Sequence, residues 1–233
     1  MTKLESTTHR PQIRAVVFDM DGLMLNTEDV FDLAGRQLLA RRGLEMTNLI
    51  RHSMLGRRPI EAFNALKLHT GMPDQIEDLM HETKELFEAI AENSLATMPG
   101  LHDVLDLVES LDLPRAVATS SPRAYMMPLL ERFNLLHRFH FTLTAEDVTH
   151  GKPDPEIYQM AASRLNVSPT EMLVLEDSET GTRAAHAAGA YIVSVPNRHT
   201  VVGDFSMSRL VIDSLLDKRL HDLLRTTEGP LEK

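Results

Sequence analysis

Two aspartates that directly follow a short apolar run are the residues of this sequence best placed to do chemistry. The run at residues 15–18 predicts a buried strand, and Asp19, Asp21 and Gly22 come next. Because side chains alternate along a strand, both carboxylates project to the same side and could hold one cation. Mg²⁺ suits such a site because it takes oxygen ligands. These residues predict a metal-dependent site at the carboxyl end of a strand, where α/β sheets bind ligands.

Two plainer interpretations compete with a catalytic metal site. A calcium loop of the EF-hand type needs an acid or Asn at position 23 and a Glu at position 30, whereas the chain has Leu23 and Val30. That interpretation fails. A solvated turn after a strand is the other, and these residues alone leave it open. The residues at the other strand ends must decide.

A cluster of hydroxyls follows the second predicted strand. Thr119, Ser120 and Ser121 come after the apolar residues 116–118 and just before a predicted helix. Hydroxyls and backbone N–H groups near a helix start can bind a phosphate. They can equally serve as ordinary helix caps, and the cluster alone does not separate the two roles.

A lysine and two further acids occupy the remaining strand ends. Lys152 lies between a glycine and two prolines, which stiffen its loop and reduce the entropy lost in orienting it toward an anion. Glu176 and Asp177 follow the apolar residues 172–175. Each feature has a structural alternative. Lys152 could be an ordinary solvated lysine. Glu176 and Asp177 could be there because acids are favoured at a helix start. Because all of these residues fall at strand ends, one site explains them together.

Alternating strands and helices predict the fold that positions these residues. The expected class is α/β, with a Rossmann-like, mostly parallel sheet and helices on both faces. After the first strand the pattern is helical to about residue 95, which predicts an inserted all-helical cap. The expected division is a core of residues 1–26 and 97–233 and a cap of residues 27–96. Strands are expected at residues 13–18, 116–118, 139–143, 172–175, 191–195 and 210–212.

Composition narrows the class of protein. The 233 residues are 42% hydrophobic, enough for a proper core, and the formal net charge of −10 without a long basic run argues against nucleic acid and anionic membranes as partners. The chain has no cysteine, so a metal site must use oxygen or imidazole ligands. No signal peptide or membrane span is evident, and we expect a cytoplasmic protein. The oligomeric state is open, with a monomer slightly favoured.

Four motifs together resemble the haloacid dehalogenase superfamily of phosphohydrolases, in the branch with a helical cap after the first strand. The segment MPGL at residues 98–101 is similar to the family's return from cap to core. The resemblance spans nearly the whole chain. The motifs are FDMDGLMLNTE at 18–28, VATSS at 117–121, GKPDPEIY at 151–158 and LEDSETGTRAAHAAGA at 175–190.

The resemblance implies a role for each residue. Asp19 would be the nucleophile that forms an aspartyl-phosphate, and Asp21 would act as general acid and then as general base. Lys152 would neutralise charge between the nucleophile and the phosphoryl group. The implied substrate-binding residues are Gly22, Thr119, Ser120, Ser121, Lys152 and Arg57, of which Thr119 and Lys152 are also catalytic, and the implied Mg²⁺ ligands are Asp19, Asp21 through its carbonyl, Glu176 and Asp177.

The resemblance also orders the candidate reactions. Asp21 favours phosphoryl transfer, because dehalogenases need no acid there. The implied activity is Mg²⁺-dependent hydrolysis of a small phosphorylated metabolite of the sugar phosphate, nucleotide or phosphoglycolate class. A β-phosphoglucomutase-like reaction is the alternative, weakened by Phe31 and Pro122, where the mutase pattern has His and Lys. A non-enzymatic metabolite-binding or scaffold protein is disfavoured, because it needs no nucleophile.

Arg57 is the expected cap contribution to the site. It lies in the turn LGRRP at residues 55–59, which the resemblance places opposite the active site when the cap closes. We expect it to bind a polar or anionic group of the substrate, although a solvated arginine is the plain alternative. Asn26, where the family more often has Asp, has no assigned role.

Overall fold

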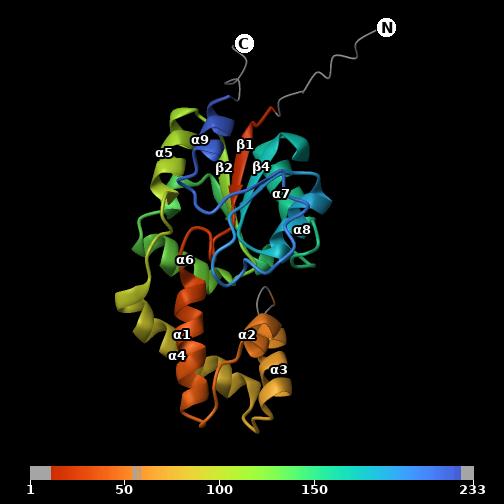
Figure 1. Ribbon diagram of the computed structural model, residues 1–233. Coiled ribbons are helices and arrows are strands. Elements are labelled where there is room, and N and C mark those ends of the chain that lie inside the picture. Colours follow the sequence, from red (N-terminus) through yellow and green to blue (C-terminus); the bar gives the residue numbers. More distant parts are fainter. Residues whose placement is uncertain (1–11, 55–56, 58, 227–233) are drawn as a thin grey trace.

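A parallel sheet of six strands forms the centre of the computed structural model, which describes residues 12–54, 57 and 59–226 (Figure 1). Its order is β3-β2-β1-β4-β5-β6, and each pair of neighbours is parallel. This confirms the predicted α/β class. The strands are β1 (Ala15–Phe18), β2 (Arg115–Ala118), β3 (Phe141–Leu143), β4 (Met172–Glu176), β5 (Tyr191–Ser194) and β6 (Leu210–Val211).

The strand β1 is buried on both faces because helices cover the sheet from both sides. Ala15 and Val17 join the apolar cluster under α7 (Glu156–Leu165) and α8 (Glu179–Ala188). Val16 and Phe18 join the opposite cluster, under α5 (Leu101–Ser110), α6 (Arg123–Arg132) and α9 (Lys218–Arg225). Figure 1 shows α5 and α9 on one side of the sheet and α7 and α8 on the other. The continuous apolar run of β1 therefore follows from its central place.

Four further helices lie beyond the sheet, and we call them the helical insertion. They are α1 (Thr27–Ala40), α2 (Asn48–Met54), α3 (Pro59–Thr70) and α4 (Ile76–Ser94). Figure 1 shows them below the sheet, with α1 and α4 beside each other. They fall within the segment expected to form a cap, although the domain boundaries at residues 26 and 97 stay a prediction.

Asn26 joins the two chain segments that connect the helical insertion to the sheet. Its side-chain amide donates to the carbonyl of Ser94 over 3.1 Å, and its side-chain oxygen accepts from the backbone of Ala96 over 2.7 Å. Its backbone also donates to Ala96. Next to it, Leu25 and Thr97 form an antiparallel bridge. Asn26 therefore links the segment that enters the helical insertion to the segment that leaves it.

Several predicted elements begin later or run shorter than the sequence pattern indicates. The strand expected at 13–18 begins at Ala15. The pattern of residues 214–225 predicts a last helix, but α9 begins at Lys218, because the side chain of Asp217 accepts a hydrogen bond from the backbone of Arg219 and caps the helix there. The strand expected at 139–143 is limited to Phe141–Leu143, since a 3-10 turn at Leu136–Arg138 precedes it. None of these differences moves a predicted site residue.

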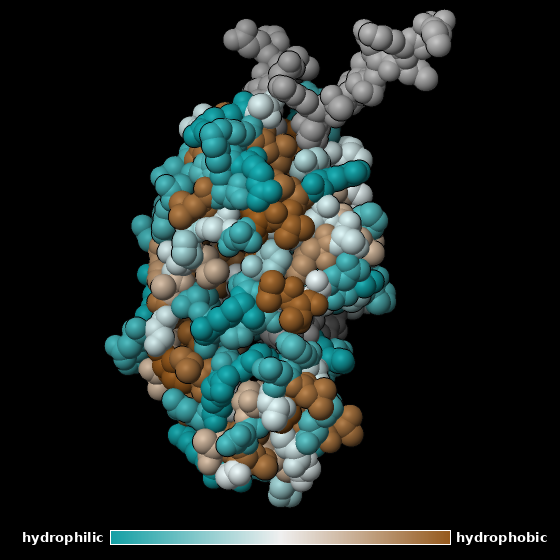
Figure 2. Space-filling model, viewed as in Figure 1, coloured by the Kyte–Doolittle hydropathy of each residue, from teal (hydrophilic) through white to brown (hydrophobic). Residues whose placement is uncertain are grey.

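The surface in Figure 2 is mixed in character. Hydrophobic side chains on this face are scattered in small groups among hydrophilic ones. Isolated exposed apolar residues of this kind are normal for a monomeric surface. None of the described helices has the combined length and apolar character that a membrane span requires.

Candidate active site

The predicted site residues meet at the carboxyl end of β1. Phe18, the last residue of β1, is in register with Val117 of β2 and Leu175 of β4, so the three strands end at nearly the same level. Asp19 follows the first of these strands and Thr119 follows the second. The sheet order also reverses direction at β1, and this switch point is where open α/β sheets bind ligands.

A buried lysine joins two of the acids. The Nζ of Lys152 donates to Oδ1 of Asp19 and to Oε1 of Glu176, both over 2.6 Å, and to the carbonyl of Ala118 over 2.9 Å. Its side chain is only 4% exposed. Burial by itself would lower the pKa of Lys152, but the charges of Asp19 and Glu176 outweigh it and raise that pKa well above the ordinary value. Lys152 is therefore a fixed positive charge beside Asp19.

Glu176 is fully buried behind that lysine. Besides Lys152, the hydroxyl of Tyr158 donates to its Oε1 over 2.5 Å, and the hydroxyl of Ser178 donates to its Oε2 over 3.1 Å. The helix α8 passes so close that a Cβ on Gly181 would lie 1.8 Å from Oε1. Glycine at this position therefore makes room for the carboxylate.

Asp177 reaches the same site from beside Gly22. Its Oδ2 accepts a hydrogen bond of 2.8 Å from the side-chain amide of Asn197, which also donates to the carbonyl of Gly22 over 3.3 Å. Gly22 has a φ of +81°, and a Cβ there would lie 2.4 Å from Oδ2 of Asp177. Glycine therefore permits both the turn and the close approach.

The carboxylates of Asp19, Glu176 and Asp177 form a cluster that could hold a cation. Each offers an oxygen within 4.8 Å of the others, and all three residues are buried. Burial, followed by mutual repulsion, raises the pKa of Asp177 well above its usual value, and burial also raises that of Asp19 although Lys152 opposes it. A hard divalent cation would relieve this repulsion, and an all-oxygen donor set fits Mg²⁺.

Asp21 is held by three hydroxyls. Thr119 and Ser121 donate to its Oδ2 over 3.0 Å and 2.7 Å, and Tyr125 donates to its Oδ1 over 3.3 Å. The backbone of Ser121 in turn donates to the hydroxyl oxygen of Thr119 over 3.0 Å. The hydroxyl cluster after β2 therefore orients the second aspartate, in addition to the expected role beside a phosphate.

Tyr125 links this aspartate to the helical insertion. Its ring centroid lies 5.8 Å from that of Phe31 on α1 and 5.5 Å from that of Phe87 on α4. Burial, followed by the nearby charge of Asp21, raises the pKa of Tyr125 well above its usual value, so the phenol stays protonated and donates. Tyr125 was not predicted from the sequence, because it lies one helical turn beyond the motif VATSS at residues 117–121.

Asn197 was not predicted from the sequence, although a signal for it was present. Asn197 lies three residues after the end of β5, whereas Asp177 directly follows β4, and β5 pairs with β4 in the parallel sheet. Its amide contacts both Gly22 and Asp177, as described above. A polar side chain after the fifth strand should therefore have been considered together with the other strand ends.

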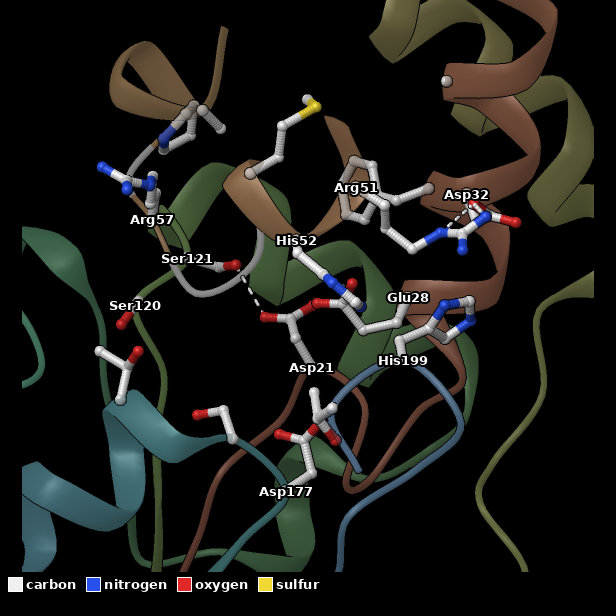
Figure 3. A pocket seen from close by; sticks show the side chains of 18 of the residues that line it. Asp21, Glu28, Asp32, Arg51, His52, Arg57, Ser120, Ser121, Asp177 and His199 are labelled. Carbon is white, nitrogen blue, oxygen red and sulfur yellow. Dashed lines mark hydrogen bonds and ion pairs between the residues drawn. The ribbon is translucent and has the colours of Figure 1, made fainter. Parts of the chain in front are cut away.

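A cavity of about 510 Å³ opens above these residues and continues between the helices of the helical insertion (Figure 3). Gly22 and Glu176 are not among its lining residues, since both lie behind the wall. Arg57 lines the cavity and is exposed. The other predicted residues that line it are Asp19, Asp21, Thr119, Ser120, Ser121, Lys152 and Asp177.

Glu28 is a further acid in this cavity, at the start of α1. Figure 3 shows its side chain reaching toward Asp21. Its pKa is raised to about 7, first by burial and then by the charges of Asp21, Asp29 and Asp32. Glu28 therefore changes charge near neutral pH, inside the cavity.

The family model for haloacid dehalogenase-like hydrolases matches residues 16–195 of this chain. The chain belongs to this family. It is 32% identical over 177 residues to a phosphorylated carbohydrates phosphatase of Thermotoga maritima, covering 76% of this chain and 82% of that one. It is also 32% identical over 194 residues to a validoxylamine A 7'-phosphate phosphatase of Streptomyces hygroscopicus, covering 80% and 87%.

A solved structure supports the same assignment. CbbY from Rhodobacter sphaeroides in complex with phosphate is 27% identical, with a TM-score of 0.76 over 88% of this chain and 96% of that one. Together with the curated relatives, it identifies the chain as a phosphoric monoester hydrolase. The family recognised from the four motifs is thereby confirmed.

Gly181→Ala tests the packing of Glu176. The new methyl group must displace the carboxylate and so disturb Lys152, and we expect a loss of about 1–3 kcal/mol in stability, a fall of several degrees in Tm and a turnover reduced at least about 10-fold. The control is Gly35→Ala on α1, whose Cβ would meet only the terminal methyl of Met46, at 2.8 Å. That variant should hold or raise Tm, because Ala favours helices. Equal losses of Tm and turnover in both variants would contradict the conclusion that Gly181 makes room for Glu176.

Glu28→Gln tests the raised pKa of Glu28. Because the folded-state pKa of about 7 exceeds the ordinary glutamate value of 4.5, ionised Glu28 costs stability. This cost is complete above pH 7, shrinks as pH falls toward 4.5, and is absent below it. The variant should therefore raise Tm at pH 8 and change it little at pH 4, both measured in chelator. The exposed Glu45→Gln is the control and should show no such difference. A gain that is independent of pH would refute the titration.

Proposed function

We propose that this protein is a Mg²⁺-dependent phosphatase that hydrolyses a small phosphorylated metabolite through an aspartyl-phosphate. The observation that carries the proposal is the position of Asp19 at the end of β1, bonded through Oδ1 to Lys152 and close to two further buried acids. Asp21 lies two residues further on, beside the same cavity. A nucleophile, a fixed cation, a metal-binding cluster and a proton carrier are thus brought together.

In the first step, a carboxylate oxygen of Asp19 attacks phosphorus and the bond from phosphorus to the leaving oxygen breaks. Lys152 neutralises part of the charge that Asp19 and the phosphoryl group bring together. Asp21 gives its proton to the leaving oxygen, so the product departs as a neutral alcohol. Thr119, Ser121 and Tyr125 orient Asp21 for this transfer.

In the second step, water attacks the phosphorus of the aspartyl-phosphate and the bond to the Asp19 oxygen breaks. Asp21, now ionised, accepts a proton from that water, which restores both carboxyl groups to their starting states. One residue can therefore serve both half-reactions. The three hydroxyls that hold Asp21 keep it beside the reacting group in both.

Mg²⁺, when bound, would neutralise the phosphoryl oxygens and reduce the repulsion between them and Asp19. We propose Asp19, the carbonyl of Asp21, Glu176 and Asp177 as its site. Glu176 also accepts hydrogen bonds from Lys152, Tyr158 and Ser178, so it contributes charge to the site and fixes the lysine. The buried position and oxygen donors of the cluster support the metal.

Hydrolysis is favoured over the mutase alternative by the surroundings of Phe31. Its ring packs at 4.4 Å from Phe87 and lines the cavity, where it offers no proton to a substrate. Pro122 likewise offers no charge for a second phosphate. The curated relatives named above are also phosphatases. We further propose that Arg57 binds a polar or anionic group of the leaving portion, since it lines the same cavity.

Asp19→Asn should keep the fold but reduce kcat at least about 10³-fold, because an amide is a poor nucleophile and a poor metal ligand. The measurement is hydrolysis of para-nitrophenyl phosphate with Mg²⁺, together with a thermal melt that confirms folding. The exposed Asp103→Asn on α5 is the control and should retain full activity. More than a tenth of wild-type activity in purified Asp19→Asn would refute the nucleophile.

Removal of Mg²⁺ should stop turnover, and readdition should restore it. Ca²⁺ should inhibit, because it takes more ligands at longer distance and engages both carboxylate oxygens of Asp19. Mg²⁺ should also raise Tm in a concentration-dependent manner, since it binds the folded protein. Asp177→Ala should weaken that shift. Full turnover in excess EDTA would remove the metal from the mechanism.

A further inference from the structure

The cavity above Asp19 has two chemically different ends. Its floor comes from the loops after the strands and carries charged and hydroxyl side chains. Its other end lies between helices of the helical insertion, where apolar side chains outnumber the polar Asp32, Arg51 and His52. Large apolar side chains form much of this part of the wall. These are Phe31, Leu38, Met46, Met54, Phe63 and Leu66.

The cavity as a whole is larger than the voids that close packing leaves. Protein interiors are packed as tightly as organic crystals, with few voids bigger than a water molecule. The cavity of about 510 Å³ falls instead in the size range of pockets that enclose small-molecule ligands. Two small residues in its lining, Gly35 on α1 and Ala62 on α3, help to leave this space open.

Thr83 on α4 gives a second, independent indication of a ligand. It lines the cavity and is 8% exposed, and its buried hydroxyl has no hydrogen-bond partner in the described structure. A buried hydroxyl normally has a partner, because leaving it without one destabilises the fold. An occupant with one polar atom at this depth would satisfy it.

We infer that the leaving group of the natural substrate carries an apolar arm that enters the helical insertion between α1, α3 and α4. The inference rests on the proposed function and names the substrate class: a phosphate monoester with a polar region next to the ester and a hydrophobic body beyond it. Continuity of the cavity supports this arrangement, because Asp19 and Leu66 line the same space. Glu28 lines the same cavity on the side of Asp21, and its carboxylate can accept a hydrogen bond from a hydroxyl of a bound molecule.

The test compares glycerol phosphate with its benzyl ether, in which the ring is attached to the hydroxyl farthest from the phosphate. Both esters have the same reacting alkoxide, so a difference in kcat/KM reports the arm alone. The wild-type protein should prefer the benzyl ether at least about 10-fold, because burying an aromatic ring is favourable. Equal values, or a preference for glycerol phosphate, would overturn the inference whether or not any variant folds.

Ala62→Leu should remove this preference by filling the apolar end, so that the ratio of kcat/KM for the benzyl ether to kcat/KM for glycerol phosphate falls to about one. Ala62→Val fills less space and should reduce the preference in part, which keeps the test informative if the larger variant is unstable. Asn64→Leu is the control, since Asn64 is exposed on the same helix and does not line the cavity. A preference that persists in a folded Ala62→Leu protein would overturn the inference.

Failure of the inference and failure of the proposed function give different results. If para-nitrophenyl phosphate is hydrolysed in an Asp19-dependent reaction but the benzyl ether is not preferred, only the apolar arm is refuted. If none of the three esters is hydrolysed in an Asp19-dependent reaction, the proposed phosphatase function is refuted. The inference of an apolar arm is then refuted as well.

Discussion

The buried contact of Lys152 with Asp19 and Glu176 is the interaction on which this site depends. Three carboxylates within 4.8 Å of one another repel strongly, and burial removes the water that would otherwise separate their charges. Lys152 offsets part of that repulsion from inside the cluster. Removing one partner of a buried charge pair leaves the other uncompensated, which typically costs about 3–5 kcal/mol. The lysine therefore supports the fold and also holds Asp19 in place.

The sheet provides the geometry that makes this contact possible. Parallel strands in register end at one edge, so short loops after β1, β2 and β4 bring residues far apart in the sequence to within hydrogen-bond distance. Glycine then sets how closely they can approach. At Gly22 and Gly181 a side chain would collide with Asp177 and Glu176. The acids thus pack against backbone, which fixes them more firmly than flexible side chains would.

The residues predicted from the sequence and those missed differ in the kind of signal that they leave. Asp19, Asp21 and Asp177 closely follow strands, and Lys152 lies in the loop before α7. Their charges and their positions in the sequence pattern were enough to mark them as candidates. Tyr125 acts through one hydroxyl on a helix and looks like an ordinary amphipathic core residue. Its contacts with Asp21 and with the rings of the helical insertion depend on tertiary packing, which no local pattern encodes.

Asn26 and Asn197 illustrate the same limit. Both act through side-chain amides that join segments distant in the chain, so their partners cannot be inferred from neighbouring residues. The strand and helix order was predictable because burial and periodicity are repeated over many residues. The ends of helices and strands were less predictable. At Asp217, for example, one hydrogen bond sets the start of α9.

Two different parts of the chain supply the lining of the cavity. The loops of the sheet supply the charged and hydroxyl side chains around Asp19, whereas the helical insertion supplies most of the apolar side chains of the lining. Tyr125 connects the two, since one side of it bonds to Asp21 and its ring packs against Phe31 and Phe87. A shift of the helical insertion would therefore change the support of Asp21. Binding of a leaving group can in this way affect the chemistry of its own release, without direct contact between the leaving group and Asp19.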